Sequence, residues 1–288
     1  LRWRLAGNIP PAAKSICSPF DTQARYSIKR ATEWVGYKVH LTETCGAEEP
    51  HLITHVVTTA ATEQDTEVVD DLHVALAEKE LTPGEHLADM GYSDSYSLVN
   101  ACQEYGIEMV VPMRADHSWQ QRADQGYDLY HFQIDWEAEQ ATCPQGQTSA
   151  SWVSGSDTKG NPRIEVMFNT SVCAPCQARP LCTKSKRKRR KITIRPQEEA
   201  TLLQTVRADQ QTETFWERYA TRAGVEGTIS QAVVALTMRR SRYRGLTKTH
   251  LQHVATAVAI NIKRLDNWWN GHPFSNTQSS RFALLMAI

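Results

Sequence analysis

Two stretches of alternating apolar and polar residues lie near the start of the chain, at residues 34–44 (WVGYKVHLTET) and 51–62 (HLITHVVTTAAT). Successive side chains of a β-strand point to opposite faces, so this alternation predicts two half-buried strands. Gly46 and Pro50 lie between them, which predicts a turn and therefore an antiparallel pair. Such a sheet has a face to bury, and the elements that follow are expected to pack on it.

The next segments switch between helical and strand-like patterns. Residues 63–81 place apolar side chains at helical spacing, and Pro83 with Gly84 ends this pattern. Three further segments are interpreted as a short strand that ends in a turn, a second helix and another strand; they are 85–94, 95–106 and 107–113. This order predicts an α/β fold with a mixed sheet flanked by helices.

The pattern changes after residue 113. Residues 128–143 and 149–173 alternate like the strands of hairpins and are rich in turn residues. Helical periodicity returns at about Gln197, continues to Gly224, and appears again in a last helix whose apolar stripe is Leu251, Val254, Ala255, Val258, Ile262 and Leu265. We therefore predict four segments, which are the first part of the α/β domain (1–113), a β-rich insertion (114–196), a helical return (197–272) and a tail (273–288).

Four of the seven cysteines lie within the predicted insertion, at Cys143, Cys173, Cys176 and Cys182. Three thiols within ten residues and a fourth on a facing hairpin can close a tetrahedral Zn²⁺ site. Free thiols and disulfides are the alternatives, and a cytosolic setting disfavours disulfides. The spacing favours a structural zinc site.

Charge is segregated along the chain although the formal net charge is zero. Residues 43–89 carry twelve acidic side chains and one basic one, whereas two short segments are strongly basic, at 184–195 and 239–248. A charge run is often a solvated loop, but two basic clusters in a neutral protein favour a polyanionic partner such as double-stranded DNA over a membrane surface. The cations predicted to contact DNA are Lys186, Arg187, Lys188, Arg189, Arg190, Lys191, Arg239, Arg240, Arg242, Arg244 and Lys248.

Membrane insertion and secretion are not expected. No apolar run approaches the roughly 18 residues that a membrane-spanning helix needs. The first residues lack the apolar core and the cleavage site of a signal peptide. We therefore expect a cytoplasmic protein.

Two acidic residues lie in contexts that allow chemistry. Asp89 follows a short apolar segment (HLADMGYSD), where an isolated Asp is more often a turn residue. Glu226 follows Tyr219 and Arg222 at spacings that predict all three side chains on one helix face. Taken alone, Glu226 is better interpreted as a solvated helix charge.

The motifs GYKVHLTET, LITHVVTTAATEQD, LADMGYSD and YATRAGVEGTISQAV together resemble the catalytic domain of bacterial insertion-sequence transposases of the DDE class, between about Phe20 and Trp269. The branch of that family with a cysteine-bearing β insert is the most similar. The resemblance implies a ribonuclease H-like fold in which Asp89 and Glu226 hold catalytic Mg²⁺ (or Mn²⁺). It also implies that Arg222 holds a phosphate and that Tyr219 contacts the DNA backbone.

This resemblance implies cleavage and strand transfer of DNA phosphodiesters at insertion-sequence ends, with transposon ends and target DNA as partners, an active homodimer and a place in the nucleoid. The first catalytic Asp of the family should lie on a strand upstream of residues 34–44. Asp21 is the one acid within reach, and its flanks are typical of a loop. Val233 stands where the family often has Lys. The chain starts at Leu1, and we expect it to be an N-terminally truncated fragment.

Two other functions fit these patterns. The first is a non-catalytic, zinc-containing DNA-binding remnant of a transposase. The second is a metal-dependent nuclease that cuts DNA without joining strands.

Overall fold

A computed structural model of the protein describes residues 6–272, apart from residues 30, 47, 48, 115–117, 124 and 159. The chain divides into two compact units. The first unit comprises Leu1–Tyr92, Tyr105–Val110 and Trp216–Ile288, and the second comprises Ser93–Glu104 and Val111–Phe215. The tail predicted at 273–288 lies outside the described residues.

The first unit contains an antiparallel sheet of three strands in the order β1-β2-β3. The strands are β1 (Arg25–Lys29), β2 (Thr32–Glu43) and β3 (Ile53–Ala60). The pair predicted at 34–44 and 51–62 is confirmed as β2 and β3. β1 was not predicted, because its five residues bury little apolar surface, with Ile28 55 % exposed.

The two neighbours of β2 occupy different halves of its length. β1 pairs with the first half, from Lys29 opposite Thr32 to Arg25 opposite Gly36. β3 pairs with the second half, Tyr37–Glu43, on the other edge of β2. Among the described strands, none pairs with this second half on the edge away from β3.

β4 (Glu85–Leu87) and β5 (Glu108–Val110) form a separate, parallel sheet. The prediction of one continuous mixed sheet is therefore wrong for the described residues, because no strand there bridges β2 and β4. The strand expected before Asp89 is present as β4.

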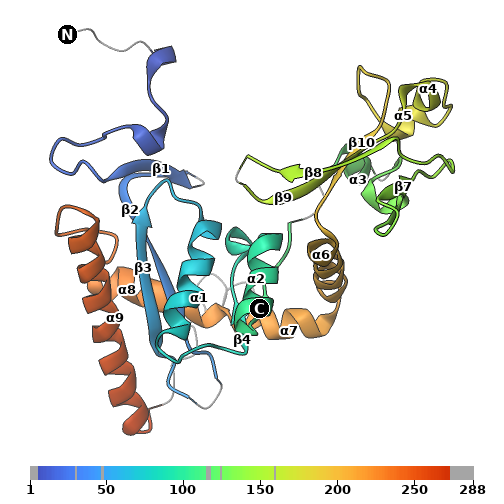
Figure 1. Cartoon of the computed structure of the whole chain (residues 1–288). Helices are drawn as coiled ribbons and strands as arrows, with labels where there is room; N and C mark the ends of the chain where they lie inside the picture. The colour runs from blue at the N-terminus through green and yellow to red at the C-terminus, as the bar shows by residue number, and fades with distance from the viewer. Residues whose placement is uncertain are drawn as a thin grey trace, which may run out of the picture. The chain divides into compact units, whose positions relative to one another are not determined.

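Three helices pack around the β1-β2-β3 sheet, namely α1 (Val69–Ala77), α8 (Ala223–Leu236) and α9 (Leu246–Trp269). α9 runs along β3, and α1 lies on the other side of that strand (Figure 1). Burial of apolar side chains from β3, α8 and α9 stabilises this arrangement, and the cluster consists of Ile53, Ala232, Met238, Ala257 and Ile260.

The helical segment predicted from about 197 to 224 is interrupted twice, into α6 (Gln197–Asp209), α7 (Glu213–Ala220) and α8. At the first break the Thr212 hydroxyl accepts the Phe215 N–H at 3.2 Å, and at the second the Thr221 hydroxyl donates to the Arg218 carbonyl at 2.8 Å. Threonine side chains compete with the backbone for such hydrogen bonds, which favours helix ends.

The break between α7 and α8 corrects the prediction that Tyr219, Arg222 and Glu226 lie on one helix face. Tyr219 lies in α7, Arg222 is the N-cap residue of α8 and Glu226 lies in its first turn. The three residues are therefore not on one face of a continuous helix. Their side chains nevertheless lie close together, as described below.

The second unit contains the predicted hairpins. β6 (Gln133–Asp135) pairs with β7 (Gln140–Thr142). A three-stranded antiparallel sheet has the order β10-β9-β8, with β8 (Ser151–Ser156), β9 (Pro162–Met167) and β10 (Lys191–Ile194). β10 was not predicted because its two buried isoleucines directly follow the basic run; the core that they join contains Phe132, Ala141, Ile164, Val166 and Phe168.

Helices of the second unit are α2 (Ser95–Tyr105, whose last residue belongs to the first unit), α3 (Trp119–Ala123), α4 (Thr170–Cys173), α5 (Arg179–Cys182) and α6. Single 3-10 turns occur at Ala6–Asn8, Ala12–Lys14, Asp65–Val68, Met90–Tyr92 and Leu129–His131. Within the described ranges, no helix has both the length and the apolar character that crossing a membrane requires.

Candidate functional site

A cleft of about 400 Å³ lies in the first unit, lined by residues of β2, α1, β4 and α8. Its apolar lining includes Val39, Leu41, Leu72, Leu76, Leu87, Val225 and Ile229. Its polar lining includes His40, Glu43, His86, Asp89, Tyr92, Arg222 and Glu226. The acids Asp89 and Glu226, 137 positions apart in the chain, thus line the same cleft.

The guanidinium group of Arg222 lies between these two acids. Its Nη1 is 2.9 Å from Glu226 Oε1, and its Nη2 is 3.9 Å from Asp89 Oδ2. The Arg222 side chain is 16 % exposed, whereas that of Glu226 is 69 % exposed and reaches solvent. One positive charge therefore offsets the repulsion between the two carboxylates.

Tyr219 completes this group. Its ring centre is 5.6 Å from the Arg222 guanidinium carbon, which allows a cation–π contact. Burial raises the pKa of the Tyr219 hydroxyl, and the nearby charges of Asp89 and Glu226 raise it as well, although Arg222 lowers it. The phenol is therefore protonated at neutral pH and can donate a hydrogen bond.

Asp65 is a second acid beside Asp89 that the sequence patterns did not identify. A Cβ on Gly91 would lie 2.7 Å from Asp89 Oδ1 and 3.1 Å from Asp65 Oδ2, so both carboxylates approach this glycine. Asp89 Oδ1 also accepts the Gly91 N–H at 2.6 Å, and Asp65 forms an ion pair of 2.9 Å with Lys38. An alanine at position 91 would displace the Asp89 carboxylate from this position, so glycine permits the close approach.

The buried face of the cleft carries neutral polar side chains. His40 Nδ1 is 2.6 Å from the Tyr92 hydroxyl, and His86 Nδ1 is 2.9 Å from His73 Nε2. Burial lowers the pKa of His86 to about 4, and the neighbouring His73 contributes to this shift. His86 is therefore uncharged at neutral pH and offers no cation to a phosphate group.

Asp21 lies elsewhere and is not among the residues that line the cleft. Its carboxylate accepts the Tyr37 hydroxyl at 2.8 Å and the Gly245 N–H at 3.0 Å, besides the N–H groups of Gln23 and Ala24. Partial burial raises its pKa, but these hydrogen bonds lower it further, so the net shift is downward. The hydrogen bond from the Gly245 N–H to Asp21 holds the loop before α9.

The first basic cluster lies in the turn before β10, in the second unit. Lys191 pairs with Glu165 at 2.6 Å, and Arg190 donates to the Cys182 carbonyl at 2.7 Å. Arg189 is half-buried, whereas Lys186, Arg187 and Lys188 are exposed and form no ion pair with any described residue.

The second basic cluster lies in the first unit, in the loop between α8 and α9. Gln252 fixes this loop, because its amide accepts the Arg242 N–H at 2.8 Å and donates to the Arg240 carbonyl at 2.9 Å. The cations are exposed and form no ion pair among the described residues, namely Arg239, Arg240, Arg242, Arg244 and Lys248. The Arg244 guanidinium carbon lies 5.1 Å from the centre of the Phe20 ring. A rigid backbone with solvent-facing cations is suited to phosphate binding.

Four thiols line one small pocket of about 40 Å³ in the second unit, and they are Cys143, Cys173, Cys176 and Cys182. Burial raises the pKa of the Cys182 thiol to about 11, although the nearby Arg190 lowers it. Within the part of the chain that the structure describes, no three His, Cys, Asp or Glu side chains are arranged to hold a metal ion. The prediction that the four cysteines lie close together is therefore confirmed, but their positions do not have the geometry of a metal site.

Comparison with known proteins gives one family match. Residues 142–266 match a family described as the transposase DDE domain. This range contains the four cysteines, both basic clusters and the Tyr219, Arg222 and Glu226 group. No curated protein and no solved structure matches the chain. The family match supports the resemblance to DDE-class transposases that the motifs indicated, over residues 142–266 of the chain.

Proposed function

We propose that the cleft is the catalytic site of a bacterial insertion-sequence transposase that cleaves DNA phosphodiesters and transfers the DNA strand. The observation that carries this proposal is the position of Asp89 and Glu226 on either side of Arg222 at the cleft. One acid follows a strand and the other lies at the start of a helix, so rigid elements hold both.

The chemistry of the donors suits Mg²⁺ or Mn²⁺, because both ions prefer carboxylate oxygens and the carboxylates of Asp89 and Glu226 line the same cleft. When bound, such ions activate the attacking oxygen and stabilise the leaving oxygen of a phosphodiester. Arg222 would bind a DNA phosphate oxygen through its planar guanidinium group. Tyr219 would donate a hydrogen bond to the DNA backbone beside it.

A third carboxylate is proposed to come from an additional strand. In the described part of the chain, the second half of β2 pairs only with β3, and β4 pairs only with β5, so each strand has an edge without a partner strand. Residues of both β2 and β4 line the cleft. Strand edges beside an apolar cleft accept a further strand readily. We infer that a strand ending in the first catalytic Asp fits there.

We expect the 288-residue chain to bind DNA but to nick it poorly, and a version extended at its start by a strand that ends in Asp to nick in the presence of Mg²⁺. The reason is that two-metal catalysis needs a further carboxylate. Conversion of supercoiled plasmid to the open circle measures nicking. Robust cleavage by the chain as given, lost on Asp21→Asn, would show that Asp21 is the first acid.

The main alternative is a non-catalytic DNA-binding remnant, which the two exposed basic clusters favour. Absence of nicking by the extended protein together with tight DNA binding would support it. A nuclease without strand transfer would nick but would not join a pre-cut transposon end to target DNA. By the family resemblance, the active complex is proposed to be a homodimer on both transposon ends, in the nucleoid.

We also propose a structural Zn²⁺ bound by the four thiols, since thiolates are preferred zinc ligands and these four share one pocket. The chain should then purify with about one zinc per molecule. Cys176→Ser should lose this zinc, whereas Cys102→Ser, which changes an exposed cysteine outside the pocket, should keep it. Equal zinc content in both variants would exclude the site.

A further inference from the structure

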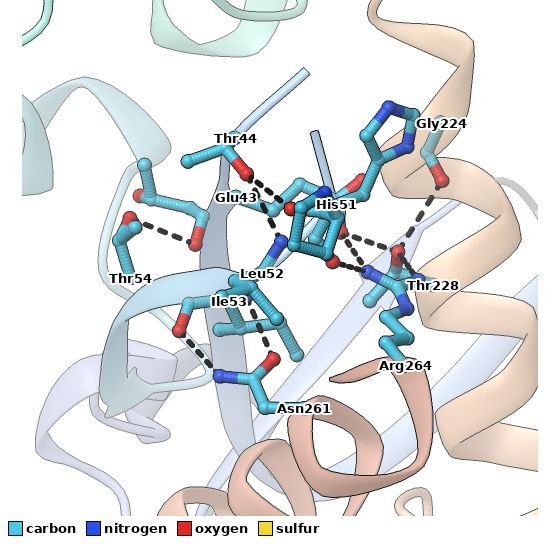
Figure 2. A network of polar contacts seen from close by, with 12 residues as sticks. Glu43, Thr44, His51, Leu52, Ile53, Thr54, Gly224, Thr228, Asn261 and Arg264 are labelled. Carbon is cyan, nitrogen blue, oxygen red and sulfur yellow. Dashed lines mark hydrogen bonds and ion pairs between the residues drawn. The ribbon is translucent and has the colours of Figure 1, made fainter. Parts of the chain in front are cut away.

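A buried polar network links the end of β2 to α8 and α9 (Figure 2). Arg264 Nη1 is 3.0 Å from Glu43 Oε2, and the two side chains are only 14 % and 5 % exposed. The Thr228 hydroxyl is fully buried; it donates to Glu43 Oε2 and accepts from Arg264 Nη2. Arg264 also donates to the His51 carbonyl.

The network meets α8 near its start, close to the candidate catalytic residues Arg222 and Glu226. Thr228 lies two positions after Glu226, so the two side chains point to different sides of the helix. Thr228 also lies 3.3 Å from the Gly224 carbonyl, within the first turn. Glu43 Oε1 comes within 3.3 Å of a Cβ placed on Gly224. The contacts of Thr228 therefore hold the buried side of the start of α8, and Glu226 lies on its other side.

We propose that Glu43, Thr228 and Arg264 are positioning residues that fix the rotation and depth of the first turn of α8, so that Glu226 and Arg222 face Asp89. This inference rests on the proposed function of the cleft. Apolar contacts alone would allow the helix to slide or rotate, whereas charged hydrogen bonds impose a direction. Because α8 follows a two-residue break after α7, its first turn has no continuous helix before it to set its orientation.

Glu43 lines the cleft, but its negative charge is neutralised by Arg264. Oε2 receives both Arg264 and Thr228, so the carboxylate is compensated by a buried guanidinium group. Removing one partner of a buried ion pair leaves the other charge uncompensated and destabilises the folded protein strongly. For this reason substitutions at Thr228, which carries no charge, give a cleaner test than substitutions at Glu43 or Arg264.

Asn261 offers a matched control, three positions before Arg264 on the same helix. Its amide donates to the Ile53 carbonyl at 2.9 Å and accepts the Ile53 N–H at 2.8 Å (Figure 2). These contacts fasten α9 to β3 without touching α8. A substitution at Asn261 therefore tests the general stability of the unit without releasing the turn that carries Glu226.

The experiment measures Mn²⁺ affinity of the 288-residue chain by electron paramagnetic resonance, together with the melting temperature of each variant. Thr228→Val keeps the side-chain shape and removes the hydroxyl, and it should weaken Mn²⁺ binding about 10-fold, as loss of an outer-shell partner typically does. Thr228→Ser should restore affinity to within about 2-fold, because it keeps the hydroxyl. Asn261→Ala should lower the melting temperature but leave Mn²⁺ affinity unchanged.

Glu226→Gln separates the two ways in which the idea can fail. If Glu226→Gln weakens Mn²⁺ binding and Thr228→Val does not, the positioning role is overturned and the proposed site stands. If Glu226→Gln has no effect, the proposed metal site and the positioning role are both overturned. Equal losses for Thr228→Val and Asn261→Ala would assign the network to stability alone.

Discussion

Replacing Glu226 with glutamine, in a version of the protein that also carries the proposed additional strand, is expected to abolish Mg²⁺-dependent nicking and to leave DNA affinity within about 2-fold of that version without the change. The amide keeps the shape of the side chain but removes the negative charge that a divalent cation requires. Loss of several kcal/mol of transition-state stabilisation lowers the nicking rate by a factor of at least about 10³. Asp89→Asn should give the same result for the same reason.

Glu217→Gln is the matched control, because Glu217 is an exposed acid on α7 that is not among the residues lining the cleft. Plasmid nicking and DNA binding by fluorescence anisotropy should both match the wild type for this variant. Nicking that survives Asp89→Asn, or that falls equally for Glu217→Gln and Glu226→Gln, would contradict the assignment of the active site.

Replacing Lys186, Arg187 and Lys188 with glutamine should weaken DNA binding about 100-fold at 0.1 M salt and make the plot of log affinity against log salt shallower by about 2.7. Each cation that neutralises one phosphate contributes about 0.9 to this slope through counterion release. These three side chains were chosen because they are exposed, whereas Lys191 is already paired with Glu165. Loss of affinity should not depend on the DNA sequence, since phosphate contacts do not read bases.

A triple variant at Lys14, Lys29 and Lys263 changes the net charge by the same amount at exposed positions outside both basic clusters. Its salt slope should stay near that of the wild type. If the two triple variants had equal slopes, the run at 186–191 would be a solvated loop and the DNA contacts would lie elsewhere.

Local patterns in the sequence were sufficient for the elements with strong periodicity. β2 and β3 were predicted from alternation that continues over many residues, and the pairing followed from the short turn between them. The β6–β7 and β8–β9 hairpins were predicted for the same reason. Candidate acids were found by motif, because Asp89 and Glu226 stand in contexts typical of one transposase class.

Short or locally ambiguous elements were not predictable in this way. β1 buries little apolar surface, and β10 is masked by the cations beside it. The breaks around α7 depend on the hydroxyls of Thr212 and Thr221, whose hydrogen bonds compete with a helix that the periodicity alone would continue.

What the sequence determined by itself was the type of most elements, because strand alternation, helical spacing and turn residues act over a few neighbouring positions; its motifs also named Asp89 and Glu226 as candidate acids. Only the tertiary structure decided which distant side chains meet. Glu43 and Arg264 are 221 positions apart, and neither lies in a motif that marks it as a partner of the other. Their pairing, and that of Asp89 with Arg222, depends on which surfaces of the sheets and helices pack together, and a local pattern does not encode that choice.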